Sequence, residues 1–217
     1  VLNRWDYFRS FSTFFEDVRP SFIVEYENFG GAKLEVPVFN RGKFGVKHKA
    51  GNYDMQYYQN ENFSASDTAD ATRLFMNVSS VYYEESSLNK KHFPTEGSYF
   101  VLKAKQFNIF ENTIPGSTSP LTFETQDKFH QWFSLHGKYE RYFNCFKNYT
   151  IGLHAEAHWM WVTGFLDNYT ATIISAPSFQ PILETRALYL PENNGHDITS
   201  LGMKNIFQFS DNISLRI

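Results

Sequence analysis

The sequence predicts an all-β protein, an antiparallel up-and-down meander that forms part of a transmembrane β-barrel. Apolar and polar side chains alternate with a period of two, as they do in strands with one face in lipid and one in water. Short and long connections alternate between these stretches. Aromatic residues make up 18% of the chain, with 23 Phe and 13 Tyr, and aromatics favour strands and membrane interfaces.

The clearest predicted strand runs from Asn148 to Thr163. Its apolar positions have odd numbers, and we expect them to face lipid: Tyr149, Ile151, Leu153, Ala155, Ala157 and Trp159. Its even positions up to His158 hold no large apolar residue, so His154, Glu156 and His158 are expected to face the barrel interior. The physical reason is that a Lys or Arg on the lipid face of a barrel costs roughly 2–4 kcal/mol at mid-bilayer.

The preceding strand, from Lys128 to Phe143, alternates in the same way, and Phe133 and Leu135 are among its predicted lipid-facing residues. A short turn over 144–147 joins the two strands into an antiparallel hairpin. Opposed residue numbers in such a hairpin have a constant sum, which must be even here because both polar faces have even numbers. Sums of about 290 or 292 fit the turn. We favour 292, which places His136 opposite Glu156, over 290, which places it opposite His154.

Weaker alternation predicts further strands along the rest of the chain. They lie at 32–38, 44–58, 74–82, 99–110 and 196–209, and the last turns into 213–217. A phase change near Gly51 would be explained by a β-bulge. The segment 3–17 fits both helical and strand spacing and is predicted as a strand. Residues 1–217 are therefore predicted as one barrel fragment of about eight to ten strands, and both ends look truncated.

The connections between these strands fall into two classes. Those at 40–43, 144–147 and 210–212 are short, 85–97 is intermediate, and 59–70, 112–126 and 164–195 are long. Transmembrane barrels have short turns on the periplasmic side and long loops outside. The loop at 164–195 mixes β-branched residues with prolines, and it either plugs the lumen or caps the barrel from outside.

Composition and charge exclude several other classes of protein. The net charge is −3, and the Lys and Arg residues are scattered, so no nucleic-acid partner is expected. The single cysteine, Cys145, excludes an internal disulfide. No apolar run approaches the roughly 18 residues of a membrane helix, so a membrane-spanning form of this chain must be a barrel.

Two groups of side chains are candidate metal ligands. His154, Glu156 and His158 share one strand face, and His136, like His130, shares the polar phase of the neighbouring strand. Such residues bind zinc or another divalent metal, but a hydrogen-bonded polar lumen wall is the simpler interpretation. Asp67 and Asp70, with Glu61 nearby, are candidate calcium ligands, but their spacing matches no EF-type loop, and a solvated loop is the simpler interpretation. No metal and no cofactor is therefore predicted.

Three stretches resemble a known family. They are Phe15 to Phe22 (FEDVRPSF), Asn62 to Asp70 (NFSASDTAD) and Asn168 to Pro181 (NYTATIISAPSFQP). They are similar to the C-terminal half of patatin-like phospholipases from Bacteroidetes, where a patatin domain and a small periplasmic module precede a barrel like that of the BamA (surface antigen) superfamily. The resemblance covers nearly the whole chain from about residue 7 onward.

The resemblance implies a bacterial outer-membrane protein whose barrel anchors an acyl-hydrolase domain or forms its pore. Its partners would be membrane lipid, other outer-membrane proteins or the rest of its own parent chain. Patatin catalysis uses a serine in G-x-S-x-G and an aspartate in D-G, and this sequence contains neither motif. No catalytic residue is carried over, so the chain itself is not predicted to be an enzyme. A BamA-type assembly or translocation barrel and a soluble aromatic-rich β-domain that binds carbohydrate remain alternatives.

Overall fold

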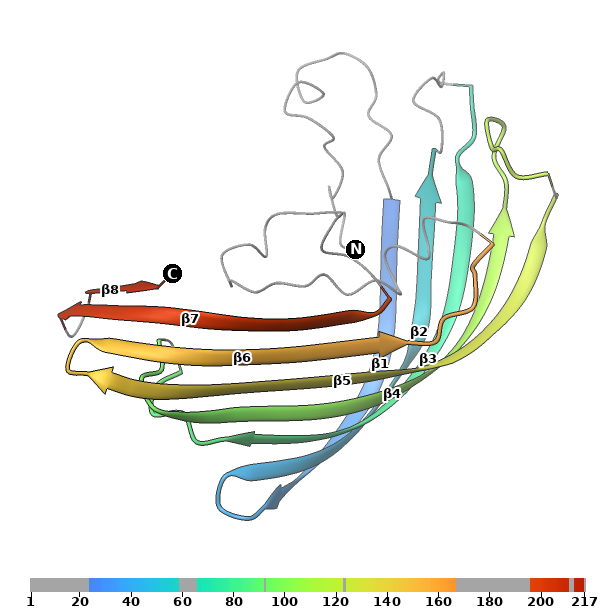
Figure 1. Cartoon of the computed structure of the whole chain (residues 1–217). Helices are drawn as coiled ribbons and strands as arrows, with labels where there is room; N and C mark the ends of the chain where they lie inside the picture. Colours follow the sequence, from blue (N-terminus) through green and yellow to red (C-terminus); the bar gives the residue numbers. More distant parts are fainter. Residues whose placement is uncertain are drawn as a thin grey trace.

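In the computed structural model (Figure 1), eight strands form one antiparallel sheet in which each strand pairs with its neighbours in the sequence. The structure describes residues 24–58, 66–91, 93–122, 124–166, 196–210 and 213–216. The strands are β1 (Val24–Val38), β2 (Gly42–Tyr57), β3 (Asp70–Ser86), β4 (Gly97–Ile114), β5 (Gln126–Phe146), β6 (Tyr149–Met160), β7 (Ile198–Ser210) and β8 (Ile213–Arg216). The predicted all-β antiparallel meander is confirmed. The sheet is curved, with β1 and β8 as its two edges, and it is not closed into a barrel.

The connections are sorted by length to the two ends of the sheet. The short turns 39–41 and 147–148 lie at one end, toward the left and bottom of Figure 1, where β3 also ends, β4 begins and β7 ends. At the other end β2 ends and β3 begins, β4 ends and β5 begins, and β6 ends and β7 begins. We call the part of each strand near the short turns the turn-side half and the remainder the loop-side half. The first turn is earlier than predicted, because Gly42 and Lys43 already pair with Val38 and Pro37.

In the hairpin of β5 and β6, even-numbered residues pair with even-numbered residues as expected, but the register differs from the expected one. His136 lies opposite His158 and Glu140 opposite His154, so even numbers face even numbers, as predicted. The favoured pairing of His136 with Glu156 is wrong by two residues, and the alternative pairing with His154 is also wrong. The cause is a turn of only two residues, 147–148, preceded by a β-bulge between Asn144 and Phe146, beyond which even-numbered residues again pair with even-numbered ones.

Strand β2 contains no bulge at Gly51, contrary to the prediction. Its pairing with β1 and with β3 is continuous through Gly51. The apolar phase changes because the concave face of the loop-side half carries an apolar core, to which Tyr53 and Met55 belong. The core consists of Tyr53, Met55, Leu74, Met76, Phe107, Ile109, Trp132, Met160 and Phe165. The concave face thus changes from polar to apolar along the strands, with no change in backbone register.

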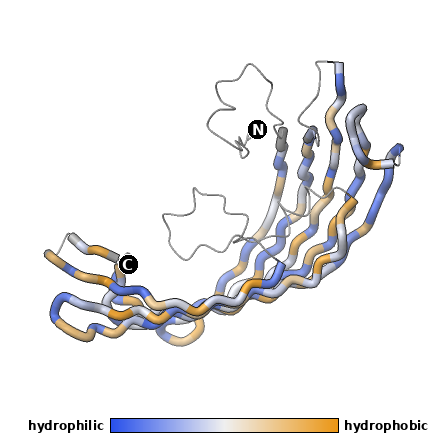
Figure 2. The backbone as a smooth tube through the Cα atoms, turned by 45° about the horizontal axis from the view of Figure 1, so that its top comes forward, coloured by the Kyte–Doolittle hydropathy of each residue, from blue (hydrophilic) through white to orange (hydrophobic). Residues whose placement is uncertain are grey.

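The convex face is mixed in the loop-side half. It carries polar pairs, including Arg73 with Asp54 at 2.7 Å and Asn112 with Asp127 at 2.6 Å. Beside them lies an exposed row of Phe75, Phe110 and Phe129. In the turn-side half the convex face carries a band of large exposed apolar side chains. These are Leu34, Val36, Phe44, Val46, Val81, Leu102, Tyr139, Phe143 and Leu153. The band continues through Phe133, Trp159, Leu201 and Met203 toward the loop ends of β5, β6 and β7. The alternation of apolar and polar residues along the strands is visible in Figure 2.

Several sequence predictions lie outside the described residues. The ambiguous segment 3–17 and most of the loop 164–195 are among them, as are the resembling stretches 15–22 and 168–181. Of the stretch 62–70, the structure describes residues 66–70. Within the ranges given above, no helix has the length and hydropathy of a membrane span.

Candidate functional site

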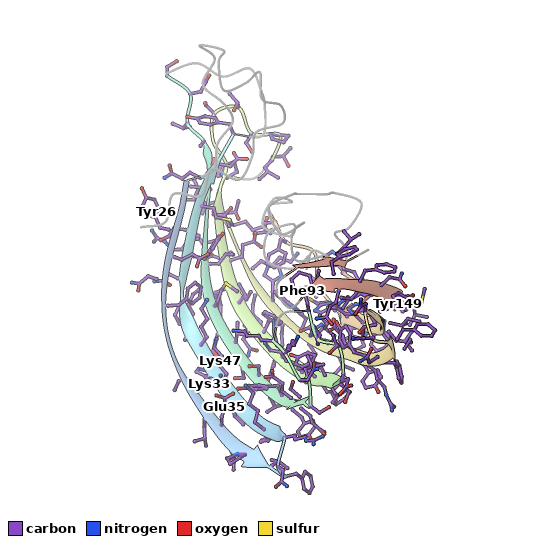
Figure 3. All side chains as sticks on the ribbon, turned by 90° about the vertical axis from the view of Figure 1, so that its left-hand side faces the viewer. Tyr26, Lys33, Glu35, Lys47, Phe93 and Tyr149 are labelled. Atoms are coloured by element: carbon purple, nitrogen blue, oxygen red, sulfur yellow. The ribbon has the colours of Figure 1, made fainter. Side chains whose placement is uncertain are left out.

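The concave face of the turn-side half is the candidate functional site, because it gathers ionisable side chains from the seven adjacent strands β1 to β7. Alternation dictates this placement, since residues two apart in a strand share a face and paired residues of neighbouring strands share it too. Figure 3 labels Lys33, Glu35 and Lys47 in this part of the sheet. The continuous registers of β1 to β7 bring these rows of side chains together.

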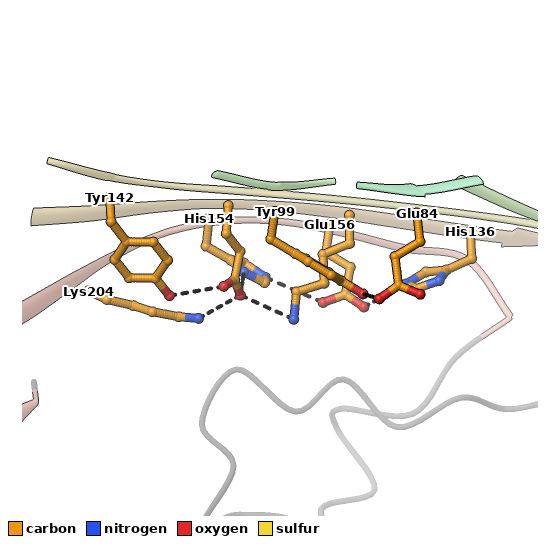
Figure 4. A network of polar contacts seen from close by, with 9 residues as sticks. Glu84, Tyr99, His136, Tyr142, His154, Glu156 and Lys204 are labelled. Atoms are coloured by element: carbon orange, nitrogen blue, oxygen red, sulfur yellow. Dashed lines mark hydrogen bonds and ion pairs between the residues drawn. The ribbon is translucent and has the colours of Figure 1, made fainter. Parts of the chain in front are cut away.

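Glu140 of β5 is the centre of one polar cluster, which we call the Glu140 cluster (Figure 4). Its carboxylate lies 2.7 Å from Lys204 Nζ of β7, 3.1 Å from Lys138 Nζ and 3.0 Å from His154 Nδ1. Tyr142 donates its hydroxyl hydrogen bond to the same carboxylate at 2.9 Å. Glu140 is buried, and a buried carboxylate is tolerated when charges and hydrogen bonds of this kind surround it.

The cluster continues along β6 to the residues predicted as metal candidates. His154 Nε2 lies 3.3 Å from Glu156 Oε2, and His136 Nε2 lies 2.8 Å from Glu156 Oε1. The His136–Glu156 contact is diagonal across the β5–β6 pair, while His158 faces His136 directly with ring centroids 5.9 Å apart. The three histidines and Glu156 thus contact one another through ion pairs and ring packing.

These contacts do not form a metal site among the described residues. No three His, Cys, Asp or Glu side chains there are placed to hold a metal ion. The same holds for the described pair Asp67 and Asp70, which brace the neighbouring loop instead. Asp67 accepts a hydrogen bond from Ser117 Oγ at 3.0 Å, and Asp70 accepts one from the Gly116 amide at 2.6 Å.

A second polar cluster, the Glu35 cluster, crosses β1, β2 and β3. Glu35 contacts Lys33 at 2.9 Å and Lys43 at 3.3 Å, and it accepts a hydrogen bond from the Tyr82 hydroxyl. Tyr82 reaches Glu35 across Gly45, where a Cβ atom would come within 2.2 Å of its ring. Lys43 also contacts Glu84 at 3.0 Å, which links the two neighbouring strands. Gly45 therefore provides the space through which this cluster is connected.

A buried pair that the sequence did not reveal lies in the loop-side half. His130 Nε2 contacts Glu111 Oε2 at 2.6 Å, and both side chains have 0% exposure. His130 Nδ1 is 3.0 Å from Thr163 Oγ1, and the Leu166 amide donates to Glu111 at 2.9 Å. These bonds hold residues 161–166, the first part of the long connection, against the concave face. Glu111 and His130 lie on different strands, so only their cross-strand proximity could have identified the pair.

The predicted lipid-facing residues lie together on the convex face. The register and burial pattern show that the odd positions of β6 lie on the face opposite to the one that carries His154 and Glu156. Leu153, Trp159 and Phe133 are exposed at 47%, 43% and 55%. The others are half-buried beside them: Tyr149, Ile151, Ala155, Ala157 and Leu135. The charged convex residues described in the turn-side half, Glu85 and Arg141, lie near the short turns.

The comparisons with known proteins gave no significant match to a family model, to a curated protein or to a solved structure.

Proposed function

We propose that this chain is part of a bacterial outer-membrane β-barrel, with its convex face against lipid and its concave face lining the lumen. The observation that carries the proposal is the apolar band on the convex face of the turn-side half. It extends from β1 to β7 and leaves Leu34 and Leu201 67% and 85% exposed. Soluble monomers rarely expose an apolar surface of that extent. The ion-paired concave face directly behind the band supports the same assignment.

The position of the band along the strands adds to this proposal. Barrel strands carry a lipid-facing apolar belt about 25 Å tall, and residues beyond the belt face water. The Arg73–Asp54 and Asn112–Asp127 pairs lie on the convex face beyond the band, in the loop-side half. We assign this half to the extracellular side, where the long loops belong.

We further propose that the barrel is the membrane anchor or pore of a patatin-like phospholipase. The resemblance of the three sequence stretches supports this assignment. The acyl-hydrolase domain is not included in the present sequence, which lacks G-x-S-x-G and D-G.

The experiment that tests the barrel is membrane fractionation of the full-length protein expressed in a Gram-negative host. We expect it in the outer-membrane fraction, released only by detergent, with electrophoretic mobility that changes on heating in dodecyl sulfate. A monodisperse protein obtained without detergent would contradict the proposal. Binding of that soluble protein to an oligosaccharide would support the carbohydrate-binding alternative instead.

The phospholipase assignment needs a separate measurement on the same preparation. We expect the full-length protein to release fatty acid from a phospholipid, and the barrel expressed from this chain to release none. Outer-membrane location without hydrolysis, together with defective assembly of other barrels when the gene is deleted, would support the BamA-type alternative.

A further inference from the structure

Three lysines of the concave face stand apart from both polar clusters. Lys47 of β2 and Lys103 and Lys105 of β4 share this face. No carboxylate among the described residues pairs with any of them, whereas Lys33, Lys43, Lys138 and Lys204 each lie within 3.3 Å of one. Lys105 instead makes a cation–π contact, since its ammonium lies 5.8 Å from the Phe107 ring centroid.

The register of the sheet brings these lysines around one small residue. Ser80 of β3 lies between Lys47 and Lys105, directly opposite each of them. Neighbouring strands are about 4.8 Å apart, so the two lysine backbones are separated by only two strand spacings. Lys103 lies two residues before Lys105, on the same face of β4. Each lysine side chain carries its ammonium on a flexible four-carbon stem. Ser80, between Lys47 and Lys105, has a short side chain and is itself buried.

The nearby carboxylates are already engaged elsewhere. Glu35 and Glu84 bind Lys33 and Lys43, and Tyr99 also donates to Glu84. On the other side, Glu140 and Glu156 are held by Lys138, Lys204 and the histidines. Lys47 also lies directly opposite Lys33 of β1, and like charges directly opposite each other destabilise a sheet. The described carboxylates therefore leave the positive charge of the three ammonium groups unbalanced, and a bound anion would balance it.

We propose that Lys47, Lys103 and Lys105 form a binding site for a multivalent oxyanion, such as a phosphate group or a polycarboxylate, above Ser80. Lysine is a common phosphate ligand that acts as a point charge. This inference goes beyond the proposed function, and it requires only three adjacent strands and no closure of the sheet. In a closed barrel the site faces the lumen, where Lys and Arg select for anions. The ligand is then a solute and not a lipid.

The test is lysine footprinting of the full-length protein in a non-ionic detergent. An amine-acylating reagent is applied at limiting dose, with and without inorganic pyrophosphate at matched ionic strength, and each lysine is quantified by mass spectrometry. We expect pyrophosphate to slow acylation of Lys47, Lys103 and Lys105. Lys138 and Lys204 are the internal controls, because they lie on the same face but are paired with Glu140.

Two variants and one further ligand make the outcome decisive. Lys105→Gln is expected to weaken pyrophosphate protection of Lys47 and Lys103 about tenfold, equivalent to ~1.4 kcal/mol, while Lys138→Gln leaves it within about twofold. Equal protection of all lysines, or none, would overturn the proposal. Protection by phosphatidic acid in micelles but not by pyrophosphate would overturn the assignment to a solute. Membrane fractionation is a separate measurement, so failure of the barrel proposal is recognised independently.

Discussion

Glu140 is a single residue on which two lysines, one histidine and one hydroxyl converge, from its own strand and from β6 and β7. Removing its charge would leave Lys204 without its carboxylate partner and would leave Glu156 as the remaining carboxylate beside His154 and Lys138. Breaking a buried ion pair on one side typically costs several kcal/mol for this reason. We expect Glu140→Gln to lower the free energy of unfolding by ~3 kcal/mol, measured by urea denaturation of the vesicle-inserted protein.

The matched control for this prediction is Glu84→Gln. Glu84 also sits on the concave face, but its side chain is 30% exposed and has one lysine partner, Lys43. Ion pairs of that exposure contribute little, so the change is expected to cost less than about 1 kcal/mol. Similar losses for the two variants would show that convergence of charges on Glu140 contributes nothing to stability.

Substitutions of the adjacent residues Leu102 and Val101 test which face of the sheet contacts lipid. Leu102 is 45% exposed within the convex apolar band, while Val101 lies on the concave face opposite Glu84 and Lys138. An arginine in lipid costs roughly 2–4 kcal/mol on a barrel surface. We expect Leu102→Arg to reduce stability in lipid vesicles by about that amount. Val101→Arg should cost under about 1 kcal/mol, because its two neighbours on the polar face, Glu84 and Lys138, carry opposite charges.

The measurement is again urea denaturation after refolding into vesicles. A neutral effect of Leu102→Arg would mean that this part of the convex face is exposed to water. A loss confined to Val101→Arg would reverse the assignment of the two faces.

At the scale of an element, the turn between β1 and β2 shows local backbone strain. Phe39 has a φ of 56° and is 89% exposed. A left-handed backbone costs roughly 1–2 kcal/mol for an L-residue with a side chain, whereas glycine adopts it freely. Since Gly loses more chain entropy on folding, we expect Phe39→Gly to stabilise the protein by a net ~0.5–1 kcal/mol.

The comparison for this turn is Phe146→Gly at the end of β5. Phe146 is also highly exposed, at 73%, but it lies in a strand and stacks on Tyr149 with centroids 6.4 Å apart. Glycine weakens strands, so the same substitution should lower the denaturation midpoint here. If both variants are destabilised, the gain from relieving the φ of Phe39 is smaller than the contribution of its ring.

At the scale of the whole molecule, the backbone pairing of the β1 edge distinguishes a closed membrane barrel from an open sheet. Hydrocarbon offers no partners to backbone N–H and C=O groups, so a sheet in a bilayer must close. We expect the vesicle-inserted full-length protein to protect every amide of Leu34 to Val38 from hydrogen exchange, apart from Pro37, which has none. Rapid exchange at alternate residues would show that this edge is unpaired, as in an open antiparallel pair. Strand β2, paired on both sides, is the internal reference.

The sequence alone indicated where most of the described strands lie, though not their exact ends, and which residues of β5 and β6 share a face. Period-two alternation is a local property, since each side chain points opposite to the one before it. The faces of β5 and β6, the even parity of their hairpin and the sorting of short and long connections to opposite ends were therefore predictable. Composition was sufficient to indicate an all-β chain, because aromatics and β-branched residues are characteristic of strands.

The tertiary structure decided what depends on partners from distant strands. The register of β5 and β6 follows from a two-residue turn and a bulge, which alternation does not specify. The phase change at Gly51 reflects an apolar core contributed by several strands and by Phe165. The Glu111–His130 pair and the grouping of Lys47 with Lys105 arise only when neighbouring strands are aligned. Charge pairing and burial are pairwise properties, so a periodicity read along one strand cannot determine them.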